Sequence, residues 1–145
     1  MDYEKLNTLY SDKRVQARSK LVFCLLENGF LLEEIINFPA ENISMLKKIK
    51  NGERFFMAYA KGAGIVERIA QSGFLFPSTN DKPMQRDSIL RTLQRACRAN
   101  GFQLHELDID GLVQIPTRGR AGGFAIQNTN ATFDDVLSFI KNQNK

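Results

Sequence analysis

The side chains in this sequence best suited to chemistry are arginines spaced along one helix. Arg91, Arg95 and Arg98 lie within residues 87–100, which carry the periodicity of an α-helix. At 100° per residue the three arginines form a stripe, and no acidic residue lies within it. This favours a line of phosphate contacts; the alternative is an ordinary solvated charged face. The apolar face opposite the stripe consists of Ile89, Leu90, Leu93, Ala96 and Cys97.

Two further arginines, Arg118 and Arg120, lie in a glycine-rich segment, residues 117–122. The flanking residues 112–115 and 123–127 predict two short strands. A hairpin with cations at its tip, placed after a helix with an arginine stripe, has the layout of a winged helix. In such proteins the cations of the wing reach phosphates or the minor groove. The alternative is an exposed loop that its arginines keep soluble.

Residues 31–54 predict two short helices with a sharp break between them. Pro39 lacks a backbone N–H and disfavours helix at the preceding residue, so the first helix should end at Phe38. Asn42 is a good N-cap for a second helix, Ile43 to Lys50, and Gly52 lies just beyond its end. The outward face of this second helix should present three polar side chains, Ser44, Lys47 and Lys48.

The end of this segment, LKKIKNGER from Leu46 to Arg54, resembles the closing turn of the helix-turn-helix in phage-repressor-type DNA-binding regulators. In that family a hydrophobic pair on the recognition helix is followed by Asn-Gly and a charged residue. The resemblance implies that the second helix is a recognition helix whose outward residues contact DNA. The alternative is an ordinary helical hairpin with solvated lysines.

The sequence offers little support for catalysis or metal binding. His105 is the only histidine, which argues against histidine-rich metal sites and paired-histidine catalysis. Cys24 and Cys97 each lie in an apolar helical pattern, which is typical of small buried hydrophobic residues in a reducing compartment. We therefore expect no enzyme activity and no cofactor.

No stretch of the sequence is typical of secretion or of a membrane span. The first residues lack the basic and then apolar plan of a signal peptide. The longest apolar run, Leu21 to Leu26, is six residues, far short of the roughly 20 that a spanning helix needs. We therefore expect a cytoplasmic protein without membrane contact.

The composition permits a polyanionic partner without requiring one. The chain has 145 residues, with 20 Lys and Arg against 16 Asp and Glu, which gives a formal charge of +4. The positive excess lies in residues 55–100, which hold seven cations and three anions. Solubility alone also favours a net charge of this size, so the distribution is more informative than the total.

Three helices should end in the same way. Gly29, Gly73 and Gly101 each follow an Asn or Ser and precede a Phe. Glycine can adopt the left-handed conformation that closes a helix, and the Phe can fold back onto the last turn. We expect each of these glycines to lie just past a helix C-terminus with a positive φ.

Together these patterns predict an α+β protein. Residues 1–75 would form a helical subdomain with the helix-turn-helix-like pair, and residues 76–86 a linker rich in proline and polar residues. Residues 87–145 would form a winged-helix-like subdomain with a helix, a small antiparallel sheet carrying the Gly/Arg hairpin, and a final helix. The expected strands are residues 103–107, 112–115 and 123–127, and the expected final helix is residues 132–142.

The leading hypothesis from sequence is a small DNA-binding protein with duplex DNA as its partner. It would be a transcriptional regulator or a plasmid- or phage-type accessory factor. The alternative is a protein-binding adaptor or inhibitor whose basic surface meets an acidic partner, and a homodimer stays open under both. The residues expected to contact DNA are Ser44, Lys47, Lys48, Arg91, Arg95, Arg98, Arg118 and Arg120.

Overall fold

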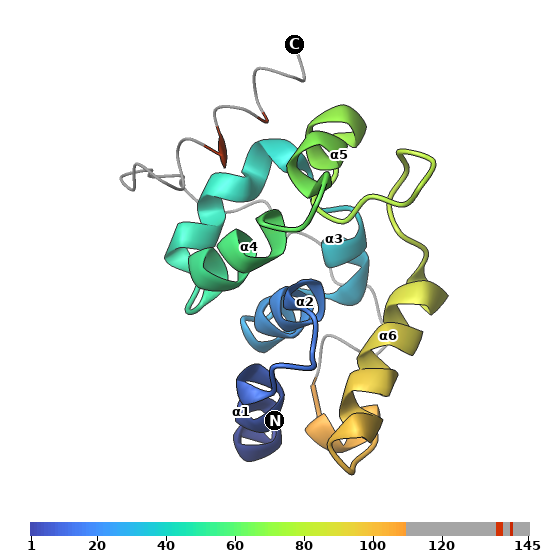
Figure 1. The fold of residues 1–145 in the computed structure, drawn as a ribbon. Helices are drawn as coiled ribbons and strands as arrows, with labels where there is room; N and C mark the ends of the chain where they lie inside the picture. Colours follow the sequence, from blue (N-terminus) through green and yellow to red (C-terminus); the bar gives the residue numbers. More distant parts are fainter. Residues whose placement is uncertain (110–135, 138–139, 141–145) are drawn as a thin grey trace.

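A computed structural model describes residues 1–109, 136–137 and 140, and helices make up its regular structure (Figure 1). The first helices are short and follow one another closely along the chain. In chain order the elements are α1 (Tyr3–Ser11), α2 (Ala17–Glu27), α3 (Leu32–Ile36), η1 (a 3-10 helix, Ala40–Lys48), α4 (Gly52–Ala60), α5 (Ile65–Ser72), α6 (Arg86–Ala99) and η2 (a second 3-10 helix, Leu104–Leu107).

The protein is mostly helical, so the predicted α+β class is wrong. Among the described residues no sheet forms, and strand pairing is limited to isolated bridges. Residues 103–107, predicted as a strand, contain the 3-10 helix η2, whose Leu104 and Leu107 are buried. These two leucines are three residues apart, so a helix with three residues per turn places both on one side.

The remaining predicted strands and hairpin lie outside the described residues. Part of the predicted final helix is described: Val136, Leu137 and Ile140 are helical, and Leu137 and Ile140 are buried. The predictions that lie outside are the strands 112–115 and 123–127 and the arginines Arg118 and Arg120.

α2 forms the centre of the molecule. Every side chain from Leu21 to Leu26 is at most 2% exposed, so this helix has to be covered on all sides. α1, α3, α4 and α6 each pack against it, with α4 making the most extensive contact. Figure 1 shows α2 nearly end-on among these helices. The run of six apolar residues is therefore a core helix.

The three predicted helix ends are confirmed. Gly29, Gly73 and Gly101 lie just past the ends of α2, α5 and α6, with φ angles of 95°, 82° and 88°. After α2, the amide of Phe30 donates to the carbonyl of Leu25 at 3.1 Å, which closes a Schellman motif. The same pattern closes α6.

The segment predicted as a helix-turn-helix contains α3, η1 and the start of α4. The break at Pro39 is present, but the second helix begins before Asn42 and is a 3-10 helix instead of an α-helix. Three residues per turn place every third side chain on one line. One such line, formed by Ala40, Ile43, Leu46 and Ile49, is buried, and so are Ser44 and Met45 beside it.

Gly52 lies beyond the end of η1, but it does not cap that helix. It is the first residue of α4. The residue before it, Asn51, has a φ of 66° and turns the chain into the new helix. A Cβ atom at Gly52 would lie 2.5 Å from the carbonyl oxygen of Leu46. The close junction between η1 and α4 therefore requires glycine at this position.

The predicted linker, residues 76–86, begins within the core. Phe76 and Pro77 are buried, and the amide of Ser78 donates to the carbonyl of Lys82 at 2.6 Å to close a turn. Buried side chains before and after this segment belong to one hydrophobic core. The division of the chain into two subdomains stays a prediction.

Candidate nucleic-acid interface

α6 exposes the predicted arginine stripe. Arg91, Arg95 and Arg98 are all exposed. Among the described residues, none of their guanidinium groups makes an ion pair or a hydrogen bond. These cations are therefore available to an anionic ligand. The opposite face is buried, as predicted, through Ile89, Leu93 and Cys97.

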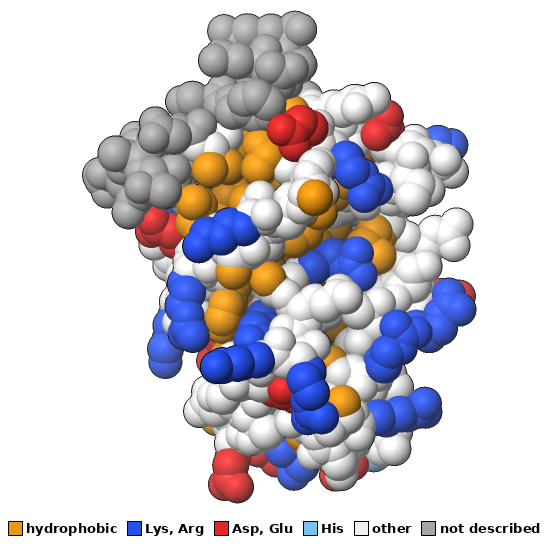
Figure 2. All heavy atoms as spheres, in the orientation of Figure 1, with side chains coloured by type: hydrophobic (Ala, Val, Ile, Leu, Met, Phe, Trp, Pro, Cys, Tyr) orange, Lys and Arg blue, Asp and Glu red, His pale blue; other side chains and the backbone are white. Residues whose placement is uncertain are grey.

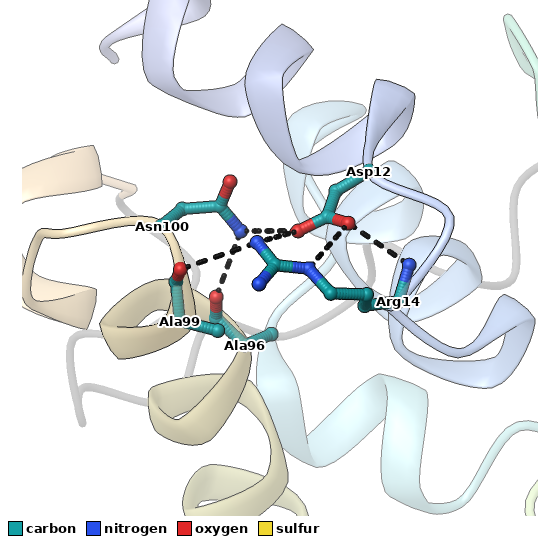
Figure 3. A network of polar contacts seen from close by, with 5 residues as sticks. All are labelled: Asp12, Arg14, Ala96, Ala99 and Asn100. Atoms are coloured by element: carbon teal, nitrogen blue, oxygen red, sulfur yellow. Dashed lines mark hydrogen bonds and ion pairs between the residues drawn. The ribbon is translucent and has the colours of Figure 1, made fainter.

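The C-terminal end of α6 is tied to the turn between α1 and α2 (Figure 3). Asn100 is the C-cap residue of α6. Its side-chain amide donates to the carboxylate of Asp12 at 2.9 Å and to the carbonyl of Ala96 at 3.1 Å. The guanidinium of Arg14 donates to the same carboxylate and, at 3.3 Å, to the carbonyl of Ala99. The bonds to Ala96 and Ala99 supply donors to backbone carbonyl groups that lack a hydrogen-bond partner within the helix at its C-terminal end.

Charge keeps this network intact at neutral pH. The side chain of Asp12 is only 10% exposed, and its hydrogen bonds to Arg14, followed by the one from Asn100, lower the pKa of its carboxyl group. At the other end of α6, Arg86 forms an ion pair with Glu33 of α3. Both ends of α6 are therefore fixed to the N-terminal helices, and the arginine stripe is held in one orientation.

The three residues predicted to face outward from the recognition helix do not form one exposed surface. Ser44 is 1% exposed, and among the described residues its hydroxyl has no hydrogen-bond partner, so its predicted outward position is wrong. The side chain of Lys47 is 13% exposed and forms an ion pair with Glu53 at 3.6 Å, whereas Lys48 is exposed. The prediction assumed 100° per residue, and the 3-10 geometry of η1 rotates these side chains differently.

η1 and α6 belong to different parts of the surface. η1 packs against α4, whereas α6 packs against α2 and α3. In Figure 1 the two lie on opposite sides of the pair formed by α2 and α4. Lys48 therefore does not extend the arginine stripe.

Two pairs of cations that the sequence did not single out lie on helices other than α6. Arg18 of α2 and Arg68 of α5 form one pair, and Lys20 of α2 and Arg54 of α4 form the other.

Electrostatics shows which charges lie near one another. Burial raises the pKa of Tyr59 to about 12, and the charges of Arg18 and Arg68 both oppose this rise, so both lie near the phenol. Partial burial and the charge of Arg54 lower the pKa of Lys20, whereas the carboxylate of Asp12 raises it. Lys20 therefore lies near both a cation and an anion.

One face of the molecule is rich in cations. Figure 2 shows Lys and Arg side chains spread over the face on which α2 is seen end-on, while most acidic side chains in view lie near its edges. Arg18 and Thr92 of α6 line the same small cavity, of about 10 Å³. Ile89 and Leu93 line this cavity too, so it lies against the buried face of α6 and not on the arginine stripe.

A second hollow lies at the junction of η1 and α4. It is open to solvent, with a volume of about 440 Å³, and Lys47, Glu53 and Arg54 contribute to its lining. The ion pair between Lys47 and Glu53 neutralises part of its charge. This hollow is therefore less suited to an anion than the face beside α6.

Both cysteines are packed in the core, as predicted. Cys24 and Cys97 are buried, and burial raises the pKa of each thiol to about 12. The thiol of Cys24 donates to the carbonyl of Lys50 at 3.0 Å. At neutral pH both thiols are protonated, which leaves them poor nucleophiles.

Comparison with known proteins places the chain in no family. No protein-family model, no curated protein and no solved structure matches it. In the part of the chain that the structure describes, none of the helices has the length and apolar character of a transmembrane span. A functional proposal therefore has to come from the geometry and charge of the surface.

Proposed function

We propose that this protein binds duplex DNA through phosphate contacts centred on α6, as a cytoplasmic transcriptional regulator or plasmid- or phage-type accessory factor. One observation carries the proposal. Arg91, Arg95 and Arg98 are exposed on successive turns of a helix whose two ends are fixed, and no described carboxylate pairs with them.

Folding stability alone does not favour such a stripe. Like charges four residues apart on a helix, as at Arg91 and Arg95, destabilise it by about 0.2–0.5 kcal/mol. Solubility is served as well by cations and anions in alternation. A guanidinium group, in contrast, matches a phosphate with two parallel hydrogen bonds. A phosphate ligand would therefore convert the repulsion into favourable contacts.

The dimensions of the stripe suit a nucleic-acid backbone. At 1.5 Å per residue, the seven steps from Arg91 to Arg98 advance by about 10 Å along the helix. Three nucleotide steps of one strand, at about 3.4 Å each, advance by the same length. Because α6 is fixed at both ends, ordering it on binding costs little, which favours affinity.

The other residues predicted to contact DNA differ in the contribution that we propose for them. Arg118 and Arg120 follow α6 in the chain and remain predicted contacts. Lys48 is a secondary contact on a different part of the surface, and Lys47 joins it only if its ion pair with Glu53 opens. Ser44 has no place in the interface because it is buried.

A titration of labelled random-sequence duplex DNA at two salt concentrations tests the proposal. Three phosphate contacts give a slope of log affinity against log salt of at least about −2.7, which corresponds to roughly 40-fold weaker binding between about 50 and 200 mM salt. A protein without generic duplex affinity would overturn the proposal. An adaptor or inhibitor with an acidic protein partner would then be favoured.

A further inference from the structure

η1 is long for a 3-10 helix. It spans nine residues, Ala40–Lys48. Runs of more than about four residues are uncommon, because the i→i+3 hydrogen bonds of a 3-10 helix have poorer geometry than those of an α-helix. Packing against the rest of the molecule therefore has to hold this segment in a form that its own backbone disfavours.

The sequence of this segment separates polar from apolar side chains better on an α-helix. At 100° per residue, Ser44, Lys47 and Lys48 fall within an arc of about 100°, opposite the four apolar residues between 43 and 49. At three residues per turn, in contrast, the buried Ser44 lies in line with Lys47. The buried Met45 lies in line with Lys48 in the same way. The local pattern and the observed form thus disagree, and such conflicts are expected at functional sites.

The 3-10 form also leaves a buried polar atom without a partner. Ser44 is 1% exposed, and among the described residues its Oγ atom makes no hydrogen bond. Burial of such a hydroxyl is unfavourable, because its hydrogen bonds to water are lost and nothing replaces them. An α-helical turn through this segment would carry Ser44 to the outer side, where water can bind the hydroxyl.

Contacts at its two ends keep η1 extended. At its start, the amide of Ala40 donates to the carbonyl of Gly73 at 2.8 Å. Beyond its end, the thiol of Cys24 donates to the carbonyl of Lys50 at 3.0 Å. An α-helix rises about 0.5 Å less per residue than a 3-10 helix, so it would be roughly 3 Å shorter over residues 43–48. A thiol is a weak donor, so the restraint beyond the end of η1 is a weak one.

We propose that η1 is a two-state element, in which residues 43–48 exchange between the 3-10 form and an α-helical form. In the α-helical form Asn42 is the N-cap, and the two lysines share one exposed face with Ser44. The exchange decides whether Lys47 stays at 13% exposure in its ion pair with Glu53 or joins that basic face. The inference goes beyond the proposed function, because η1 packs against α4 and not against α6.

The reaction of single introduced thiols with an aromatic disulfide reagent, dithiobis(nitrobenzoate), tests the exchange. Ser44→Cys, Met45→Cys and Ser19→Cys each place a thiol where the native side chain is at most 2% exposed. The native Cys24 and Cys97 are buried, and wild type measures their background rate. Met45 stays buried in both forms, and Ser19 lies on α2, so these two positions are the matched controls. We expect Ser44→Cys to react at least about tenfold faster than either control, because local exchange is more frequent than opening of the core.

Asn42→Ala is the second variant, and it separates α-helix formation from other motions. Because the N-cap of η1 is Pro39, Asn42 caps only the α-helical form. Its loss should slow the reaction of Ser44→Cys about fivefold, the effect of one lost N-cap, with little change in melting temperature. In the otherwise native chain, Asn42→Ala should also slow the acetylation of Lys47 by an N-hydroxysuccinimide ester, with the exposed Lys48 as internal reference. This measurement needs no change at Ser44, so it decides the question if Ser44→Cys does not fold.

Each outcome supports or overturns the inference. Equal rates for Ser44→Cys and Ser19→Cys overturn it, because Ser44 then stays in the core. Equal rates for Ser44→Cys and Met45→Cys overturn it as well, since the segment then unfolds locally and does not convert. A fast reaction of Ser44→Cys that Asn42→Ala does not slow would contradict the α-helical form. None of these results depends on DNA binding, so the proposed function stands or fails on its own titration.

Discussion

The side-chain amide of Asn100 donates a hydrogen bond to the carboxylate of Asp12 at 2.9 Å, across 88 residues of sequence (Figure 3). Asp12 lies between α1 and α2, and Asn100 caps the helix that carries the arginine stripe. The orientation of the proposed phosphate contacts therefore depends on a turn near the N-terminus. Arg14 reinforces the link because it bonds to both the carboxylate and the end of α6.

Acid should weaken this link. In the folded protein the hydrogen bonds from Arg14, and then from Asn100, lower the pKa of Asp12. The stability that Asp12 contributes is therefore complete above its unfolded pKa of about 4 and is lost as the pH falls through that value towards the folded pKa. We expect the melting temperature of wild type to fall more steeply between about pH 5 and pH 2 than that of Asp12→Asn, which lacks the titrating group. Parallel curves would show that this carboxylate does not support the fold.

A methyl group at Gly52 should destabilise the junction of η1 and α4. Its Cβ would lie 2.5 Å from the backbone oxygen of Leu46, which cannot move aside as a flexible side chain can. We expect Gly52→Ala to lower the free energy of unfolding by about 1–3 kcal/mol, measured by urea denaturation. Gly62→Ala is the comparison variant: its Cβ would lie 2.8 Å from Cγ1 of Ile65, a side chain that can shift, and 3.3 Å from the backbone oxygen of Tyr59, so we expect a smaller loss there. An equal loss in both variants would contradict the proposed clash at Gly52.

Neutralising Lys20 should change the stability little. Lys20 is partly buried, and burial and the charge of Arg54 disfavour its charged form, whereas the carboxylate of Asp12 favours it. We expect Lys20→Gln to melt at the same temperature as wild type or to gain a few tenths of a kcal/mol, the typical size of a like-charge repulsion. A clear loss of stability would show that the attraction to Asp12 outweighs burial and the repulsion by Arg54.

Lys48 and Arg95 should contribute unequally to binding. η1 and α6 lie on opposite sides of the α2–α4 pair (Figure 1). We expect Arg95→Gln to flatten the salt slope by about 0.9, the effect of one phosphate contact. Lys48→Gln should leave the slope near that of wild type. Equal effects would place the helix-turn-helix-like segment in the main interface, as its resemblance to phage-repressor-type regulators implied.

The features that could be predicted from the sequence depend on neighbours along the chain. Gly29, Gly73 and Gly101 end helices as expected, because capping is decided by the residues within one turn. The two faces of α6 also follow from its own periodicity, and both its buried face and its exposed arginines are where the pattern placed them. A strongly amphipathic helix leaves little freedom in how it docks.

The features that could not be predicted depend on packing. The residues of η1 fit an α-helix and a 3-10 helix, and contacts with α4 decide between them, which buries Ser44. Leu104 and Leu107 are three residues apart, so in the predicted strand they would point to opposite faces, whereas in a 3-10 helix they lie on one side. The charges near Tyr59 and near Lys20 come from segments that are distant in sequence, and no local pattern indicates this proximity.

The most direct measurement compares two triple variants that lose the same charge. R91Q/R95Q/R98Q removes the arginine stripe, and K50Q/K61Q/K82Q removes three exposed lysines from loops between helices. Each is titrated with random-sequence duplex DNA over a range of salt concentrations, with thermal melting to confirm the fold. We expect the arginine variant to flatten the slope of log affinity against log salt by up to about 2.7, and the lysine variant to stay close to wild type. Equal slopes for the two variants would show that only net charge matters and would contradict a phosphate-binding surface on α6.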